Sequence, residues 1–179
     1  LSDKKLFSTK NKHFELVGVE ASIASREVSV WHQPIVKDNI PKIYAFLLKK
    51  INGIVHASVQ MVEEDFNWSG PELGPTLHGI ESHDELLNQL SSFSLTSENS
   101  RVIYDKYQSE EGGRFLEQKN RYMLIMLDED TPMEAGTDHR WMTLYQLKKL
   151  TSHECSVNIE ARTLLSAASY YTRGAPNDN

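Results

Sequence analysis

The segment IYAFLLKKINGIVHASVQMV, residues 43–62, decides the fold class. Two apolar runs, residues 43–48 and 54–62, flank the dipeptide Asn52-Gly53. Asn-Gly is the strongest two-residue hairpin signal, because both central positions of a type I′ turn need a positive φ. The segment therefore predicts an antiparallel β-hairpin.

Apolar runs elsewhere predict further strands. Residues 101–107 carry Val102, Ile103 and two tyrosines and predict one strand. Residues 122–127 are continuously apolar, which is typical of a strand buried on both faces. Residues 76–80 predict a further short strand of the sheet.

Capping signals predict the helices. Ser82 and Glu85 form the S-x-x-E pattern of a capping box, and the leucines that follow have helical spacing, so a helix is expected over residues 83–93. A second helix is expected after a cap at Thr143, and a third over residues 158–170. The elements together predict an α+β fold with a mixed sheet of four to six strands and two or three helices.

Composition excludes several classes of protein. With 39% hydrophobic and 25% charged residues, the 179-residue chain is typical of one soluble globular domain. A net charge of −6 argues against a general nucleic-acid surface, which needs clustered Lys and Arg. The single cysteine, Cys155, excludes an intrachain disulfide and any Cys-rich zinc site. No apolar run approaches the roughly 18–20 residues that cross a bilayer, and no signal peptide is evident, so a cytoplasmic protein is expected.

The domain organisation follows from the same pattern. The start of the chain is polar and aperiodic, so residues 1–25 are expected to form an N-terminal arm. Residues 26–173 are expected to form a single module, and residues 174–179 a tail.

Five blocks of sequence carry a family resemblance. They are QSEEGGRFLEQKNR (residues 108–121), RWMTL (140–144), VNIEAR (157–162), WHQPI (31–35) and the pair Pro75-Thr76. In this order they resemble the repeat unit of the NDP-hexose 2,3-dehydratases. That family removes the 2-hydroxyl of nucleotide-linked 4-keto-6-deoxyhexoses in deoxysugar and antibiotic biosynthesis. The resemblance implies a Nudix-like fold, in which helices sandwich the mixed sheet, and a hydro-lyase activity on such a sugar or a related β-hydroxy ketone.

Family members usually carry two such modules in tandem, and this chain has room for one. We therefore expect a homodimer, although a freestanding half or a piece of a longer enzyme is also consistent with the sequence. Val62 stands where the family has a lysine, and Asp65-Phe66 replaces a Pro-Gly turn. These departures favour an alternative, a catalytically silent module that binds a ligand or a protein, whereas the intact 108–121 block favours the enzyme.

The implied reaction needs a base for the C3 proton, support for the enolate and a proton donor for the leaving hydroxyl. It needs no redox cofactor, and none is expected. The resemblance selects Glu110 as the acid of the 108–121 block and Arg114 beside it, and His78 stands where the family has a glutamine after Pro-Thr. An imidazole there can serve as base or donor. The competing interpretations are a solvated turn around Glu110 and an ordinary strand histidine.

The resemblance and residue chemistry also select a substrate-binding set. Arginines are candidates for gripping a diphosphate, amides and hydroxyls for sugar hydroxyls, and a tryptophan for stacking on a base. We expect Arg121 to share one cleft with Glu110 and Arg114, because the strands that lead to them should be neighbours. Structural ion pairs and a core tryptophan are the competing interpretations. The selected residues are Gln33, Gln60, Glu64, Thr76, Arg121, Arg140, Trp141 and Arg162.

No metal site is predicted. The histidines lack the spacing of metal ligands. The chain also lacks the R-E-x-x-E-E helix of the Nudix hydrolases, so metal-dependent pyrophosphate hydrolysis is disfavoured.

Overall fold

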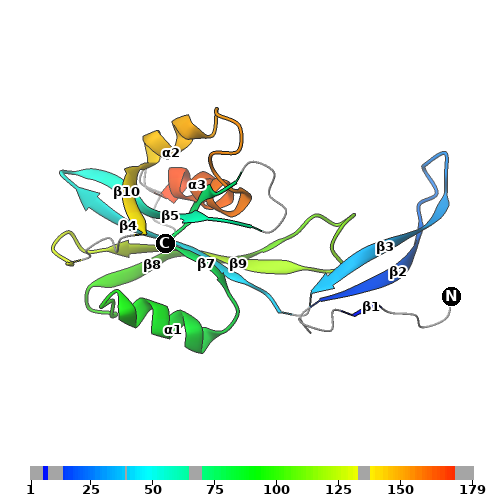
Figure 1. Cartoon of the computed structure of the whole chain (residues 1–179), viewed down its shortest axis with the longest axis horizontal. Helices are drawn as coiled ribbons and strands as arrows, with labels where there is room; N and C mark the ends of the chain where they lie inside the picture. The colour runs from blue at the N-terminus through cyan, green and yellow to red at the C-terminus, as the bar shows by residue number, and fades with distance from the viewer. Residues whose placement is uncertain (1–5, 8–13, 39, 65–69, 133–137, 172–179) are drawn as a thin grey trace, which may run out of the picture. The chain divides into compact units, whose positions relative to one another are not determined.

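The computed structural model describes residues 6–7, 14–38, 40–64, 70–132 and 138–171 (Figure 1). They divide into two compact units, which lie within Leu1–Pro41 with Tyr107–Asn120 (unit 1) and within Lys42–Lys106 with Arg121–Asn179 (unit 2). The Asp65-Phe66 pair that replaces the family's Pro-Gly turn and the expected tail at 174–179 lie outside the described residues.

Unit 1 contains a three-stranded antiparallel sheet, β1 (Leu6–Phe7), β2 (Phe14–Ser22) and β3 (Val30–Asp38), in that order. Strand β2 pairs with β3 along its whole length, from Phe14 opposite Asp38 to Ser22 opposite Val30. The expected N-terminal arm thus includes a regular strand that the sequence analysis missed. Its sequence, FELVGVEAS, mixes apolar and acidic residues without a regular alternation, so the period-2 signal is weak.

The 108–121 block contributes a turn to unit 1. Val36 N–H donates to the carbonyl of Arg114 at 2.9 Å, and Leu116 N–H donates to the carbonyl of Val36 at 2.7 Å. These two bonds join the turn to strand β3, and a parallel β-bridge links Val36 to Phe115. The turn therefore has a defined place against the β2–β3 hairpin.

The second sheet has the order β10-β5-β4-β9-β8, while β6 pairs with β5 and β7 pairs with β4. Strands β4 and β9 are parallel, and the other pairs of unit 2 whose register is defined are antiparallel. The bounds of these strands are β4 (Ile43–Ile51), β5 (Ile54–Val62), β6 (Glu72–Pro75), β7 (Leu77–Ile80), β8 (Ser100–Ser109), β9 (Lys119–Leu127) and β10 (His139–Thr143). The expected four to six strands are too few: of the ten strands among the described residues, the sequence analysis predicted β4, β5, β7, β8 and β9 and missed β1, β2, β3, β6 and β10.

The predicted hairpin is confirmed. Strands β4 and β5 pair in register up to Ile51 opposite Ile54, and Asn52 and Gly53 have φ angles of 52° and 77°. Both turn residues are thus left-handed, as a type I′ turn requires.

The three predicted helices are also confirmed: α1 (His83–Ser92), α2 (Leu144–Leu150) and α3 (Ile159–Tyr171). The Ser82 hydroxyl accepts from Glu85 N–H at the start of α1, and Thr143 forms a full capping box with Gln146 at the start of α2. Asn158 caps α3, since its side-chain oxygen accepts from Ala161 N–H at 2.9 Å. No helix in the described part of the chain is long and apolar enough to span a bilayer.

Helices cover both faces of the unit 2 sheet (Figure 1). On one face, Phe46 and Leu124 pack with Leu164 of α3; on the other, Leu47 and its neighbours pack with Leu86 of α1. Side chains of a strand alternate between faces, so β4 and β9 supply both cores. This confirms that the 122–127 strand is buried on both faces.

Candidate functional site

His78 lies on the short strand β7 of unit 2. Neighbouring residues determine the backbone conformation on both sides of it. Gln60 donates through its side-chain amide to the carbonyls of Pro75 and Thr76, both at 3.1 Å. Immediately after His78, Gly79 has a φ of 70°, a conformation that glycine adopts without strain. The backbone on both sides of His78 is thus held by specific residues.

Two carboxylates lie beside the His78 ring. Its Nε2 atom is 3.5 Å from an oxygen of Glu64 and 3.8 Å from an oxygen of Glu160. The side chains of His78 and Glu160 are largely buried, with 20% and 13% of their surface exposed, whereas Glu64 is 52% exposed and lies at the solvent edge. We call these three residues the His78 cluster.

The three side chains meet without forming hydrogen bonds to one another. Both distances exceed the 2.7–3.2 Å of an ordinary N–H···O bond. Nε2 of His78 and Oε2 of Glu160 are buried and have no hydrogen-bond partner among the described residues. Because an unpaired buried polar atom costs free energy, two of them in one place point to a group that binds there.

The His78 cluster has the composition of an acid–base site and also of a metal site. One ligand atom from each residue lies within 4.8 Å of the others, which fits a cation held by two carboxylates and an imidazole. A search for metal-ligand spacing along the sequence does not detect this cluster, because its three residues come from a loop, a strand and a helix that are far apart in the chain. As an acid–base site, the carboxylates stabilise the protonated imidazole that proton transfer produces.

Two tyrosines orient the His78 ring. Tyr44 of β4 meets it edge-on, with 5.1 Å between ring centroids, and Tyr122 of β9 stacks on Tyr44 at 5.5 Å. The two tyrosines are direct partners in the parallel β4–β9 register and are only 6% and 5% exposed. Tyr44 therefore contacts the imidazole directly, and Tyr122 packs behind Tyr44.

Thr76, a predicted sugar contact, is 2% exposed. Its hydroxyl accepts from Leu47 N–H at 3.0 Å and donates to the carbonyl of Ser58 at 2.5 Å. The structure thus gives Thr76 a role in joining strands, and its role in substrate binding stays a prediction.

Arg121 forms a bidentate ion pair in unit 2. Its Nε and Nη2 atoms donate to the two carboxylate oxygens of Asp105 at 2.8 and 2.7 Å. The hydrogen bonds from Arg121, and then its positive charge, hold the pKa of Asp105 below its usual value, against an opposing effect of burial. A diphosphate at Arg121 would have to compete with this carboxylate.

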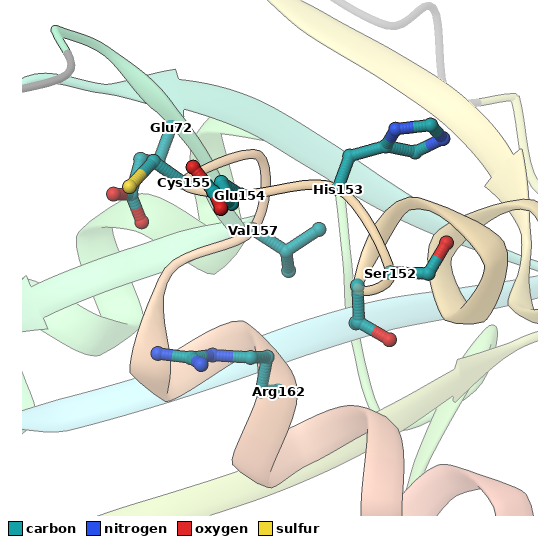
Figure 2. Close-up of a pocket in the computed structure, with 8 residues that line it drawn as sticks. Glu72, Ser152, His153, Glu154, Cys155, Val157 and Arg162 are labelled. Carbon is teal, nitrogen blue, oxygen red and sulfur yellow. The ribbon is translucent and has the colours of Figure 1, made fainter.

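The other predicted residues of unit 2 are dispersed. Arg140 donates to the carbonyl of His139 at 2.8 Å, and Trp141 packs against the core on the α1 face of the sheet. Arg162 lies on α3 and lines a cavity of about 260 Å³ with Glu72, His153 and Cys155 (Figure 2). The His78 cluster unites only two of the predicted residues, His78 and Glu64.

The remaining predicted residues lie in unit 1. The side chain of Gln33 accepts from the indole of Trp31 and donates to the carbonyl of Gly113, both at 2.9 Å. Glu110 is half-buried and accepts from the amide of Asn120 at 2.7 Å.

Arg114 is exposed, with its guanidinium 5.2 Å from the centroid of the Phe115 ring. Glu110 and Arg114 belong to unit 1 and Arg121 to unit 2, so the single shared cleft stays a prediction.

Glu160 is the residue that sequence reasoning missed. It lies inside the VNIEAR block, where only Arg162 was selected. The available signal was the acid two residues before that arginine, at the start of a predicted helix. Nothing in the local sequence indicates that this helix brings Glu160 to a histidine 82 residues earlier.

Comparison with known proteins assigns the family. A model of the NDP-hexose 2,3-dehydratase family matches residues 1–168. A dTDP-4-dehydro-6-deoxy-alpha-D-glucopyranose 2,3-dehydratase from Saccharopolyspora spinosa is 33% identical over 93% of this chain, and one from Streptomyces violaceoruber is 35% identical over 87%. The chain spans about a third of each, 35% of their length.

Solved structures agree with the expected fold. The match with the solved structure of an ADP compounds hydrolase covers 96% of this chain and 93% of that chain, with a TM-score of 0.54 at 10% identity. This likeness concerns the fold alone, and it confirms the Nudix-like α+β class. The match of the family model and the two relatives establish that the chain belongs to the NDP-hexose 2,3-dehydratase family.

Proposed function

We propose that this chain is a catalytic module that eliminates water from a nucleotide-linked 4-keto-6-deoxyhexose, with the His78 cluster as its acid–base centre. Family membership supports the substrate class, and the two relatives are named for the dTDP-linked sugar. The observation that carries the site is the buried, unpaired Nε2 of His78 between two carboxylates.

The proposed reaction begins at C3. Neutral His78 removes the C3 proton through Nε2, and the electrons of the C–H bond move to the C4 carbonyl, which becomes an enolate. Glu64 and Glu160 stabilise the imidazolium by their charge, and because Glu160 is largely buried its charge is poorly screened.

The second step expels water. As the enolate returns its electrons to re-form the C4 carbonyl, the C2–O bond breaks and the imidazolium gives its proton to the departing hydroxyl. One histidine thus acts first as base and then as acid, which regenerates the neutral ring.

Glu110 is the competing base, and Arg114 is its proposed partner in supporting the enolate. Glu110 is the acid that the family pattern selects, but the side-chain amide of Asn120 donates a hydrogen bond to its carboxylate at 2.7 Å. This contact already occupies one oxygen of the Glu110 carboxylate, whereas Nε2 of His78 makes no hydrogen bond to another described residue. We therefore place His78 first and keep Glu110 as the alternative.

Turnover of dTDP-4-keto-6-deoxyglucose by His78→Gln, Glu160→Gln and Glu110→Gln variants tests the proposal. We expect His78→Gln to lower kcat by roughly 10²–10⁴-fold, with substrate affinity nearly kept, and Glu160→Gln to lower it less. His83→Gln, an exposed histidine at the start of α1, is the matched control and should retain activity.

Loss of turnover in Glu110→Gln alone would identify Glu110, in unit 1, as the base. Binding of the sugar nucleotide by the wild-type chain without turnover would show that the module is catalytically silent. Turnover that a chelator abolishes and Zn²⁺ restores would instead assign the cluster to a cation.

We also propose a cytoplasmic homodimer. The lone cysteine suits a reducing compartment. For the dimer, the chain exposes Tyr145 (75%), Ile159 (60%) and Tyr170 (61%) on α2 and α3, apolar surface that a second copy would cover. Analytical ultracentrifugation over a range of concentrations tests the dimer; a monomer throughout would contradict it.

A further inference from the structure

A groove lies between helices α2 and α3, with an estimated volume of about 350 Å³. The buried side chain of Leu165 lines it together with hydroxyl-bearing side chains and two cationic side chains. The lining residues are Lys148, Thr151, Arg162, Leu165, Ser166 and Ser169.

The helical spacing explains why these residues share one groove. Arg162, Ser166 and Ser169 are at positions i, i+4 and i+7 of α3, and Lys148 and Thr151 are three residues apart at the end of α2. Residues with these spacings lie on one face of a helix. Each helix therefore presents one polar stripe to the groove.

The charge of the groove is positive although the chain has a net charge of −6. No carboxylate is among the described residues that line it, although Arg162 and Thr151 also line the neighbouring cavity of about 260 Å³, in which Glu72 and Glu154 lie. Within the described part of the chain, neither Lys148 nor Arg162 forms an ion pair with a carboxylate. Two like charges across one groove repel each other, and a bound anion removes that repulsion.

We infer that the groove between α2 and α3 binds a phosphate group, through the Arg162 guanidinium and the Lys148 ammonium. Arg162 uses Nε for a long bond of 3.4 Å to the carbonyl of Asn158. Figure 2 shows its guanidinium at the neighbouring cavity that Glu72 and Glu154 also line. A planar guanidinium binds phosphate through two parallel hydrogen bonds, and Lys148 adds a point charge. Ser166 supplies a hydroxyl donor beside them.

The groove and the His78 cluster lie on different flanks of α3. Glu160 and Arg162 are two residues apart on α3, hence about 200° apart around the helix. The buried stripe of α3, which includes Ala161 and Leu164, separates the two flanks. The groove is therefore inferred as a second site.

Calorimetric titration with inorganic phosphate, pyrophosphate and thymidine diphosphate tests the site. Wild-type protein should bind at least pyrophosphate saturably in the millimolar range or tighter, and Arg162→Gln should weaken that binding about 10-fold. Arg162→Lys should recover part of it. Preference for thymidine diphosphate would identify a nucleotide as the source of the phosphate, and equal binding of pyrophosphate would identify the free anion.

The decisive comparison is Lys148→Gln against Lys149→Gln. Both remove one charge from the last turn of α2, but only Lys148 lines the groove. We expect Lys148→Gln to weaken pyrophosphate binding about 3-fold and Lys149→Gln to change it less than about 2-fold. This pair decides the matter even if Arg162→Gln fails to fold.

Two results would overturn the inference. Equal effects of the two lysine variants would mean diffuse attraction to a charged surface. Absence of saturable binding by the wild-type protein would mean that no site exists. Since the assay measures binding without turnover, its outcome does not depend on dehydratase activity.

Discussion

Replacing Thr76 with Val removes a hydroxyl that joins three segments of unit 2. Thr76 is 2% exposed, and the residues it contacts, Leu47 and Ser58, are fully buried. Valine has nearly the same shape, so the change removes hydrogen bonds without creating a cavity. Leaving the Leu47 N–H without this acceptor costs about 1–3 kcal/mol, and losing the bond to Ser58 costs about 1 kcal/mol more. We expect Thr76→Val to lower the free energy of unfolding by about 2–4 kcal/mol.

The assay is thermal and urea unfolding of Thr76→Val beside Thr76→Ser. At this chain length, 1 kcal/mol shifts Tm by about 2–4 °C, so the valine variant should melt roughly 5–15 °C below wild type. Serine keeps the hydroxyl and loses one buried methyl group, which costs about 1 kcal/mol. If Thr76→Val were no less stable than Thr76→Ser, the structural role of the hydroxyl would be wrong. Weaker sugar-nucleotide binding at unchanged stability would restore Thr76 to the substrate site.

Three further predictions concern stability. Asp105→Asn should cost at most about 1 kcal/mol at neutral pH, because the pair with Arg121 is partly exposed. The pKa of Asp105 is lowered by folding, so this contribution is present above the unfolded pKa of about 3.9 and disappears as the pH falls through the folded value. Urea unfolding at several pH values should show the variant and wild type converging in acid; a constant gap would refute the pairing. Gly74→Ala should cost about 1–3 kcal/mol by chemical denaturation, because its Cβ would collide with Val62; a neutral effect would show that β5 and β6 separate easily. Asn158→Ala should cost about 0.5–2 kcal/mol by removing the cap of α3, and circular dichroism should show an earlier melt; an unchanged melt would mean that the cap is dispensable.

Elements with a local signal could be predicted from the sequence. The β4–β5 turn depends on two adjacent residues that both tolerate positive φ, and α1 and α2 start at side chains that cap them within four residues. These signals act over a few residues and can be read along the chain. The family blocks likewise predicted the Nudix-like fold, which the comparison of structures confirms.

What depends on distant contacts could not be predicted. Strand β2 is defined by its pairing with β3, and its own residues carry little alternation. Glu160 meets His78 only because α3 packs on the face of the sheet that contains Tyr44. The sequence therefore indicated His78 and Glu64, whereas Glu160 and the grouping of the three residues required the fold.

Proton exchange at C3 tests the central claim most directly. A dTDP-4-keto-2,6-dideoxyhexose has no 2-hydroxyl to lose, so in D₂O it reports removal of the C3 proton alone, by the decay of that proton's NMR signal. The wild-type chain should accelerate the exchange, and His78→Gln should reduce it by roughly 10²–10⁴-fold, while Glu110→Gln exchanges at close to the wild-type rate. Wild-type exchange in His78→Gln, with the loss in Glu110→Gln instead, would contradict the assignment of His78 as the base.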